Sequence, residues 1–369
     1  MNRLRRFGTF VVTGLIAALL VASNSPALVR AQAAPVLGTN LSEIIAGAAR
    51  EGTLDLTWSA SVMGGADVAR RHMEEFNKLW GLHLTYRFAA GPEMARQGNQ
   101  LFTEFSAGQP SSSDILFSSA QSLAPLLPHD MFLIVPWTAL SPDHRITPAM
   151  LEAGGRLVRT GTSVPVVVYN TALMPHPPST LAALINPQWN GKLATPPNAS
   201  GVDVLSATDF WGQAKALDFV RKLVAMQPGL VRCGDDDRIA SGEYAAFAED
   251  CSSQGPRILK EKGAPVNFYI PSDAAQIRYY YLAIPKNTPH PNAAVLFVLY
   301  MLSKQGQTVF YDEMRMDNDM LPGSKTADFL NQYRKAGVKF TTIDSAWWAA
   351  HPEALEGQKK EVDILSASR

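Results

Sequence analysis

Small polar residues follow several stretches of the sequence that are typical of β-strands, and their types suit anionic oxygens. These residues are Ser59 and Ser61, then Ser118 and Ser119, then Asn198, Ser200 and Gly201, and Trp58 directly precedes the first of them. Hydroxyls and the backbone N–H groups at a helix start donate hydrogen bonds to anionic oxygens. Asp250 adds an acceptor for a hydroxyl or an amine of the same ligand, and Trp58 would cover an apolar part of that ligand. A simpler role stays open for the serines and for Asp250, because both residue types commonly cap helices.

The sequence lacks the residue arrangements that catalysis needs. It contains no H-E-x-x-H pair for zinc, no G-x-S-x-G nucleophile turn and no phosphate-binding loop. The seven histidines are scattered, with no pair spaced to share a metal ion. Glu249 and Asp250 are neighbours at a strand end, so their side chains point in opposite directions. We therefore predict a protein that binds its ligand without transforming it, with no cofactor and no metal; an exported hydrolase is the less favoured interpretation.

Alternating extended and helical patterns position the first two groups of polar residues. An apolar strand is predicted over residues 53–59, and further strands over residues 82–88 and 114–117. Between the first two lies a helix with one apolar face, formed by Ala69, Met73, Phe76 and Trp80 and ended by Gly81. Strand, helix and strand in this order predict a parallel sheet and an α/β architecture. Ligands bind outside the carboxyl ends of such strands, so residues 58–61 should lie near Ser118 and Ser119.

A second region begins near residue 157 and repeats this organisation. The strand predicted over residues 163–169 contains Pro165, which suits a sheet edge or a strand start. Asn198 and Ser200 are predicted to precede a helix and so to offer a second anion site. A helix over residues 213–226 and a strand over residues 244–248 follow, and this strand delivers Asp250 to its carboxyl end.

The last part of the chain is predicted to be a strand followed by helices. The strand over residues 276–284 carries three tyrosines at positions 279–281, for which packing is the simpler role. Pro291 opens an apolar helix over residues 292–302. The tail from residue 326 onwards is predicted to be helical, with Trp347 and Trp348 anchoring it to the rest of the protein.

The N-terminus and the cysteines point to an exported protein. Arginines at positions 3, 5 and 6 precede an apolar run over residues 10–22, and alanines follow at 31 and 33. This layout predicts a cleavable signal peptide over residues 1–33 and a periplasmic protein; the export route is general secretion, with the twin-arginine route as the alternative. In that compartment Cys233 and Cys251 are predicted to form a disulfide, and two free buried thiols are the alternative.

Length and charge restrict the organisation and the partners. A chain of 369 residues is too long for one ordinary core, so we expect two domains. The 33 basic and 33 acidic residues give no net charge, which argues against nucleic acid or an anionic membrane as the main partner.

Five segments, taken in order, carry a resemblance to a known family. They are VVVYNTALM, NPQWNGKLATPP, SGEYAAF, KGAPV and IPKNTPHPNAAVLFVLYMLSKQGQ. The sequence resembles the periplasmic solute-binding components of ABC transporters, in the extracellular family that includes binders of ferric ion, phosphonates, sugar phosphates and polyamines. The resemblance implies a type II-like fold of two α/β lobes with a ligand cleft between them. The first lobe would hold residues 34–131 and, with the C-terminal helices, residues 285–369; the second would hold residues 132–284.

The resemblance also implies where and how a ligand binds. The cleft loops of the family correspond to residues 58–61, 118–119, 198–201 and 249–252. Iron-binding relatives carry adjacent tyrosines near the last position, where this sequence has Asp250, Cys251 and Ser252. We therefore predict an oxyanion-bearing solute, such as a phosphonate, phosphate ester or carboxylate, with ferric iron as the alternative. The predicted protein is a monomer whose lobes close around the solute and are then recognised by a membrane permease.

Overall fold

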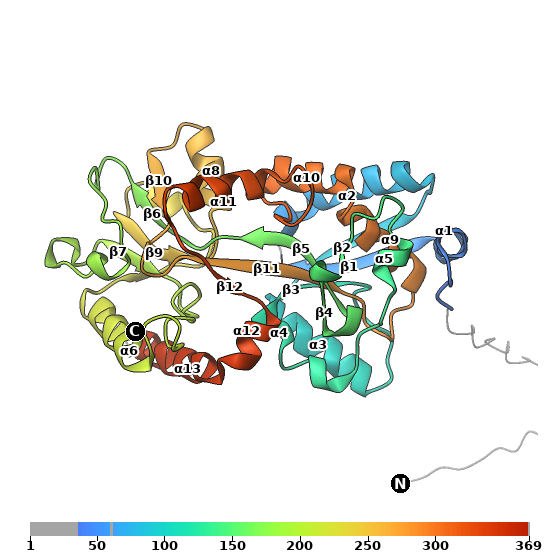
Figure 1. The fold of residues 1–369 in the computed structure, drawn as a ribbon, viewed down its shortest axis with the longest axis horizontal. Helices are drawn as coiled ribbons and strands as arrows, with labels where there is room; N and C mark the ends of the chain where they lie inside the picture. The colour runs from blue at the N-terminus through green and yellow to red at the C-terminus, as the bar shows by residue number, and fades with distance from the viewer. Residues whose placement is uncertain (1–35, 60–61, 368–369) are drawn as a thin grey trace, which may run out of the picture. The chain divides into compact units, whose positions relative to one another are not determined.

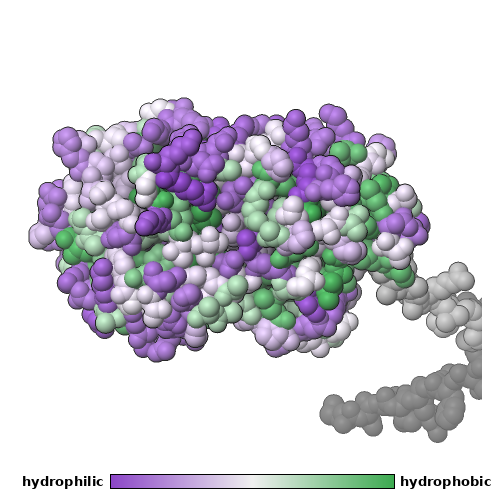
Figure 2. Space-filling model, in the orientation of Figure 1, coloured by the Kyte–Doolittle hydropathy of each residue, from purple (hydrophilic) through white to green (hydrophobic). Residues whose placement is uncertain are grey.

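The computed structural model describes residues 36–59 and 62–367. The predicted signal peptide at residues 1–33 and the predicted ligand residue Ser61 lie outside these ranges. The described chain alternates helices and strands, as an α/β protein does, and contains no helix that is both long and apolar enough to span a bilayer. Figure 2 shows one face, on which hydrophilic residues surround smaller hydrophobic areas.

The N-terminal strand, helix and strand form the predicted parallel pair. Strands β1 (Thr53–Ser59) and β2 (Thr85–Gly91) pair in parallel, with Thr53 opposite Thr85. Helix α2 (Gly65–Trp80) connects them and buries Ala69, Met73 and Phe76. The helix ends at Gly81, whose φ of 65° is in the left-handed region that glycine adopts without strain. The apolar helical face and its end were therefore predicted correctly, whereas β2 begins three residues later than expected.

The long strand β11 (Gln276–Ala283) lies at the centre of the molecule (Figure 1). It pairs antiparallel with β5 (Leu157–Ser163) and with β3 (Leu116–Ser119), and in parallel with β12 (Thr341–Ile343). Strand β4 (Leu151–Glu152) extends the sheet beyond β5. We call residues 36–59, 62–163 and 276–343, which build this sheet and the β1–β2 pair, the first lobe.

A second five-stranded sheet has the order β10–β6–β9–β7–β8. Its strands are β6 (Val166–Asn170), β7 (Leu193–Thr195), β8 (Gly229–Leu230), β9 (Ala246–Asp250) and β10 (Val266–Tyr269). The associated helices are α6 (Gln213–Ala225), α7 (Asp237–Ala240) and α8 (Gln254–Glu261). We call residues 166–269 the second lobe.

The chain passes from the first sheet to the second and back again. It leaves β5 at Ser163 and enters β6 at Val166, through Val164 and Pro165, and it returns between Tyr269 and Gln276. Trp137 and Met150 share a buried cluster with Trp58 and Phe297 of the first lobe, so these two residues pack with that lobe.

The remaining helices cover the sheets and form the tail. They are α1 (Leu41–Glu51), α3 (Met94–Ser106), α4 (Ala120–Leu123), α5 (Trp137–Leu140), α9 (Pro291–Met301), α10 (Lys304–Met314), α11 (Lys325–Lys335), α12 (Ser345–Ala350) and α13 (Pro352–Ser366). Helix α9 is buried along its whole length, as its apolar sequence predicts. Trp347 and Trp348 of α12 are buried, which agrees with their predicted anchoring role. Helix α13 packs against α6 of the second lobe, so the tail does not belong to the first lobe alone.

The structure confirms the predicted pairing of Cys233 with Cys251, whose Cα atoms are 5.5 Å apart. The bridge links the segment before α7 to the residue that follows β9. We expect the double variant Cys233→Ser/Cys251→Ser to lose about 3 kcal/mol of unfolding free energy, because the open loop gains entropy in the unfolded chain. Urea unfolding of the oxidised protein and the variant measures this difference. If thiol labelling of the denatured, unreduced protein counts two thiols, the bridge does not form.

Candidate functional site

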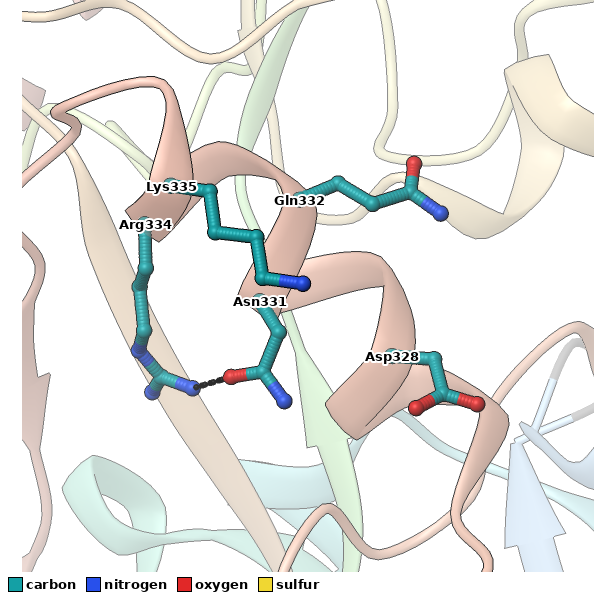
Figure 3. A pocket seen from close by; sticks show the side chains of 5 residues that line it. All are labelled: Asp328, Asn331, Gln332, Arg334 and Lys335. Atoms are coloured by element: carbon teal, nitrogen blue, oxygen red, sulfur yellow. Dashed lines mark hydrogen bonds between the residues drawn. The ribbon is translucent and has the colours of Figure 1, made fainter.

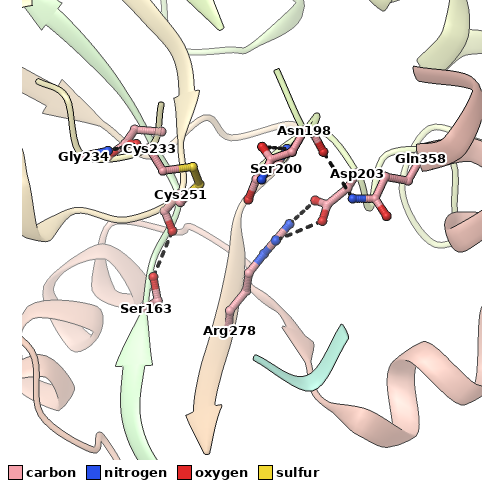
Figure 4. The surroundings of a disulfide bond; sticks show 10 residues. Ser163, Asn198, Ser200, Asp203, Cys233, Gly234, Cys251, Arg278 and Gln358 are labelled. Carbon is pink, nitrogen blue, oxygen red and sulfur yellow. Dashed lines mark hydrogen bonds and ion pairs between the residues drawn. A yellow bond between two sulfur atoms is a disulfide. The ribbon is translucent and has the colours of Figure 1, made fainter. Parts of the chain in front are cut away.

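Strands β5 and β11 of the first lobe connect the carboxyl end of β3 to that of β9. Ser119 at the end of β3 lies opposite Tyr280 of β11, and Arg278 of the same strand lies opposite Ser163 at the end of β5. The Ser163 hydroxyl donates to the carbonyl oxygen of Cys251 at 2.9 Å, immediately after β9. Figure 4 shows this contact beside the disulfide, with Arg278 on the neighbouring strand. Ser119 and Asp250, predicted from separate segments, therefore belong to one region.

Trp58 is a core residue rather than a wall of this region. Its side chain is 1% exposed and packs against Phe117 and Phe297. The indole Nε1 donates to the carbonyl oxygen of Ile115 at 2.8 Å, which holds β1 against the start of β3. The prediction that Trp58 covers the apolar part of a ligand does not agree with this burial. An alternating strand that is buried on one face explains the position, since Leu54, Leu56 and Trp58 all lie on that face.

The serines near β3 and β1 differ in their surroundings. Ser119 caps α4: its hydroxyl accepts a hydrogen bond from the backbone N–H of Ser122 at 3.3 Å, so the simpler role that the sequence left open is present. Ser118 points to the opposite face of the strand and is buried, and its hydroxyl has no partner among the described residues. Ser59 is half-buried at the end of β1.

The predicted helix after Ser200 is absent, and this corrects the proposed helix-start site. Residues 201–211 form turns, and the next helix, α6, begins only at Gln213. The side chain of Asn198 accepts from the backbone N–H of Ser200 at 3.2 Å, which satisfies a donor that the prediction gave to a ligand. Gly201 has a φ of 93°, and a Cβ there would lie 2.7 Å from the carbonyl oxygen of Glu249. Asn198, Ser200 and Gly201 therefore form a turn pressed against β9 instead of a helix N-terminus.

Asp250 is fully buried at the end of β9 and does not cap α8, whose N-cap residue is Ser253. One carboxylate oxygen accepts from the backbone N–H of Gly234 at 3.0 Å, and the other has no partner among the described residues. Burial raises the pKa of Asp250 to about 7, although the backbone N–H of Gly234 and, less strongly, the nearby backbone N–H groups of Cys251 and Ser252 act to lower it. Asp250 is thus a carboxyl group with one oxygen left for a donor.

A second buried carboxyl group, Asp236, lies beside Asp250 and was not singled out from the sequence. It is 1% exposed, and neither of its oxygens has a partner among the described residues. Burial, and then the charge of Asp250, raise the pKa of Asp236 to about 9. Its side chain presses on Gly255 in the first turn of α8, where a Cβ would lie 2.0 Å from the carboxylate. The two groups together form a site that accepts protons or hydrogen-bond donors.

Arg278 supplies the positive charge of this region, and sequence reasoning missed it. Its guanidinium forms a forked pair with the two carboxylate oxygens of Asp203, one at 3.2 Å, and its Nε donates to the side chain of Gln276 at 2.7 Å. Asp203 has no exposed side-chain surface, whereas 16% of the Arg278 side chain is exposed. A guanidinium has five N–H donors, so these bonds leave two for another acceptor. The signal in the sequence was one arginine in a strand of mostly apolar and aromatic residues, at the same alternation as Tyr280.

Gln276 and Glu249 tie Arg278 to the turn at Gly201. The Gln276 amide donates to the carbonyl oxygen of Gly201 at 2.8 Å and to the Glu249 carboxylate at 3.0 Å. Burial raises the pKa of Glu249 well above its usual range. Figure 4 shows Arg278 reaching from β11 toward Asp203, with Asn198 and Ser200 beside that pair.

Two groups of residues in the described chain have the composition of metal ligands. Cys233, Asp250 and Cys251 form one, but the two sulfur atoms are bonded to each other. Asp55, Asp114 and His290 form the other, where the Asp114 carboxylate accepts from the Asp55 backbone, the Thr288 hydroxyl and the His290 ring. Those bonds already hold β1, β3 and the segment before α9 together, which gives the second group a structural role.

Of two surface hollows among the described residues, one is near the predicted loops. A hollow of about 630 Å³ is lined by residues of α11 alone, where Arg334 donates to Asn331 at 3.1 Å (Figure 3). Because the lining residues all come from one helix, this hollow does not enclose a ligand and we assign no binding site to it. The other, of about 460 Å³, is lined by Pro197, Asn198, Gln358, Lys359, Val362 and Asp363. It lies between the turn at Asn198 and helix α13.

A known protein family matches the greater part of the chain. Residues 67–313 match the family described as bacterial extracellular solute-binding protein. The chain belongs to this family. The solute-binding protein is accordingly a binding component of transport rather than an enzyme, its ligand is a small molecule and its partner is an ABC permease. A sequence search among curated proteins finds no match.

Solved structures support the same fold. Iron-bound HitA from Pseudomonas aeruginosa is 19% identical, with a TM-score of 0.65 over 84% of this chain and 99% of that one. AfuA from Actinobacillus pleuropneumoniae with fructose-6-phosphate bound is 17% identical, with a TM-score of 0.68 over 85% and 99%. An ABC substrate-binding protein from Agrobacterium tumefaciens is 14% identical, with a TM-score of 0.71 over 86% and 96%. The solute-binding protein therefore has the predicted two-lobed α/β fold.

The buried pair Asp236 and Asp250 makes stability depend on pH. A carboxyl group whose pKa is raised by folding stabilises the folded protein below its unfolded pKa, and this contribution is lost as pH rises through the folded value. For Asp236 the loss extends from about pH 4 to about pH 9. We expect the stability advantage of Asp236→Asn over the original protein to be small at pH 5 and to grow by more than about 1 kcal/mol between pH 5 and pH 8.

Urea unfolding of both proteins at pH 5 and pH 8 tests this expectation. The matched control is Asp218→Asn, which removes an exposed carboxylate paired with Lys222 on α6. That exchange should change the unfolding free energy little at either pH, because exposed ion pairs contribute little. A stability difference between Asp236→Asn and the original protein that does not grow with pH would show that Asp236 is solvated.

Proposed function

We propose that the protein is the periplasmic, monomeric solute-binding component of an ABC importer and that its lobes close around a solute with an oxyanion group. Export through the signal peptide at residues 1–33 belongs to this proposal. Membership of the extracellular solute-binding family supports it. The mechanism is physical: a solute that contacts both lobes favours the closed state by its difference in affinity for the two states.

Arg278 is the observation that carries the oxyanion proposal. It lies on β11 of the first lobe, and its orientation is fixed by Asp203 of the second lobe on one edge and by Gln276 on the other. A guanidinium so fixed binds a phosphate, phosphonate or carboxylate with little loss of side-chain freedom, because its fork is already oriented. Two N–H groups remain for that purpose. The turn at Asn198 and Ser200 lies beside the pair, although it offers hydroxyl and amide groups rather than a helix start (Figure 4).

Asp236 and Asp250 indicate what else the solute carries. Their unpartnered oxygens accept hydrogen bonds, and leaving such buried acceptors without a donor destabilises the protein by about 1–3 kcal/mol each. A hydroxyl or an ammonium group would satisfy them. We therefore propose a solute with an oxyanion at one end and hydroxyl or amino groups at the other, such as an aminoalkylphosphonate or a sugar phosphate.

Ferric iron is the second candidate. The two buried carboxyl groups favour it, because hard cations prefer anionic oxygens. Two of the similar solved structures hold iron: HitA is iron-bound, and a Trichodesmium protein is in complex with iron and citrate. The two candidates differ in the residue on which they depend: the oxyanion depends on Arg278, and the metal on Asp236 and Asp250.

Calorimetry on protein freed of bound solute tests the proposal, with 2-aminoethylphosphonate, fructose 6-phosphate, spermidine and ferric citrate as titrants. We expect one of the oxyanion compounds to bind and Arg278→Lys to weaken it 10-fold to 100-fold, because a charge-assisted forked contact contributes about 1.5–3 kcal/mol. Lysine keeps the charge opposite Asp203 and so preserves the fold. Asp250→Asn should weaken the same compound, and Ser200→Ala should change its affinity less than Arg278→Lys does.

The control is Arg238→Lys, which changes an arginine paired with Glu243. It should leave affinity unchanged. Ferric binding that survives Arg278→Lys and is lost in Asp250→Asn would replace the oxyanion proposal with the ferric one.

A further inference from the structure

The C-terminal helices α12 and α13 make a third connection between the lobes, after the passages at residues 164–165 and 270–275. At its start, the connection is held by the first lobe: Arg159 of β5 donates to the Asp344 carboxylate at 2.7 Å. The Glu152 carboxylate of β4 accepts from the backbone N–H of Ser345 at 3.1 Å. Helix α12 lies beside α4, which directly follows β3 (Figure 1).

The other end of this connection is held by the second lobe. Helix α13 packs along α6, and its Leu365 is buried in a cluster with Leu205 and Phe219. The hydroxyl of Ser206 donates to the buried Glu361 carboxylate at 2.7 Å. Gly357 permits the close approach, since a Cβ there would lie 2.2 Å from the side chain of Ser206. The helix thus docks on the turns that follow Asn198.

Gln358 lies next to Gly357 and contacts both lobes with a single amide. Its nitrogen donates to the carbonyl oxygen of Asn198 at 3.2 Å, in the predicted ligand turn of the second lobe. Its oxygen accepts from the side-chain amide of Gln121 in α4, two residues after Ser119 of the first lobe. Figure 4 shows Gln358 directed toward Asn198, close to Asp203. Both predicted ligand segments, at Ser119 and at Asn198, are therefore tied through this side chain.

We propose that Gln358 is a positioning residue that ties the two lobes together and thereby sets the solute affinity of the protein. The inference rests on the proposed function, because it assigns a part to Gln358 in lobe closure. One amide can bond Asn198 and Gln121 at once only while both are within its reach. Movement of one lobe away from the other must break at least one of these bonds, so the tie favours the arrangement with the lobes together. A solute that requires that arrangement then binds more tightly.

Removing the tie should change affinity without removing a solute contact. For Gln358→Ala we expect the dissociation constant to rise about 3-fold to 10-fold, the equivalent of one hydrogen bond of ordinary strength. Gln121→Ala should have the same effect from the other lobe. The double variant should be no weaker than either single one, because both exchanges remove the same tie. The melting temperature should change little, since Gln358 and Gln121 are only half-buried.

Small-angle scattering of the solute-free protein and calorimetry with 2-aminoethylphosphonate and fructose 6-phosphate provide the two readouts. We expect Gln358→Ala to enlarge the radius of gyration of the solute-free protein. Its matched control is Lys359→Ala, the next residue along α13, whose exposed side chain lies outside the tie. Gly357→Ala, which pushes α13 away from Ser206, should give the same enlargement with a lower melting temperature.

Each outcome decides between the two proposals. An unchanged radius of gyration in Gln358→Ala, together with unchanged affinity, overturns the tie. Failure of both compounds to bind the original protein counts against the proposed solute class only, because scattering does not need a solute. A melting temperature that falls in Gln358→Ala without any change in radius would show a purely structural contact and also overturn the inference.

Discussion

The ion pair between Arg278 and Asp203 is the interaction on which the region between the lobes depends. Asp203 is fully buried, so its charge needs a partner inside the protein, and Arg278 supplies it from a strand of the other lobe. The pair fixes the turns after Gly201 against β11, and Gln276 adds bonds to Gly201 and Glu249 in the same place. Removing either partner would leave a buried charge uncompensated, which is far more destabilising than the loss of an exposed ion pair.

Sequence reasoning succeeded where the local pattern decides the structure. The apolar faces of α2 and α9, the end of α2 at Gly81 and the strands β1 and β11 follow from periodicity and from glycine, and each of these signals lies within about a dozen residues. The pairing of Cys233 with Cys251 followed from the predicted export to an oxidising compartment and from the presence of just two cysteines in the sequence. These features need no knowledge of what the segments pack against.

The errors concern features that distant segments decide. Trp58 was assigned to a ligand because it ends a strand, but its burial depends on Phe297, more than two hundred residues later. The segment after Ser200 was expected to be helical, whereas Gly201 must pass close to Glu249 and the chain turns instead. Arg278 was not singled out because it directly precedes three tyrosines for which packing was the simpler role. Its own role depends on Asp203 of the second lobe, with which it pairs.

The charges of the region have a consequence for selectivity. Arg278 is already neutralised by Asp203, so a solute oxyanion must either share the guanidinium or rely on its two remaining donors. Burial raises the pKa of both Asp236 and Asp250, which favours the neutral form of each carboxyl group. Once either group is ionised, it repels a second negative charge on the solute. A highly charged anion is therefore disfavoured at this end. A solute with one anionic group and a hydroxyl or ammonium group satisfies both ends at once. Its anionic group accepts from the remaining N–H groups of Arg278, and its hydroxyl or ammonium group donates to the buried oxygens of the carboxyl pair.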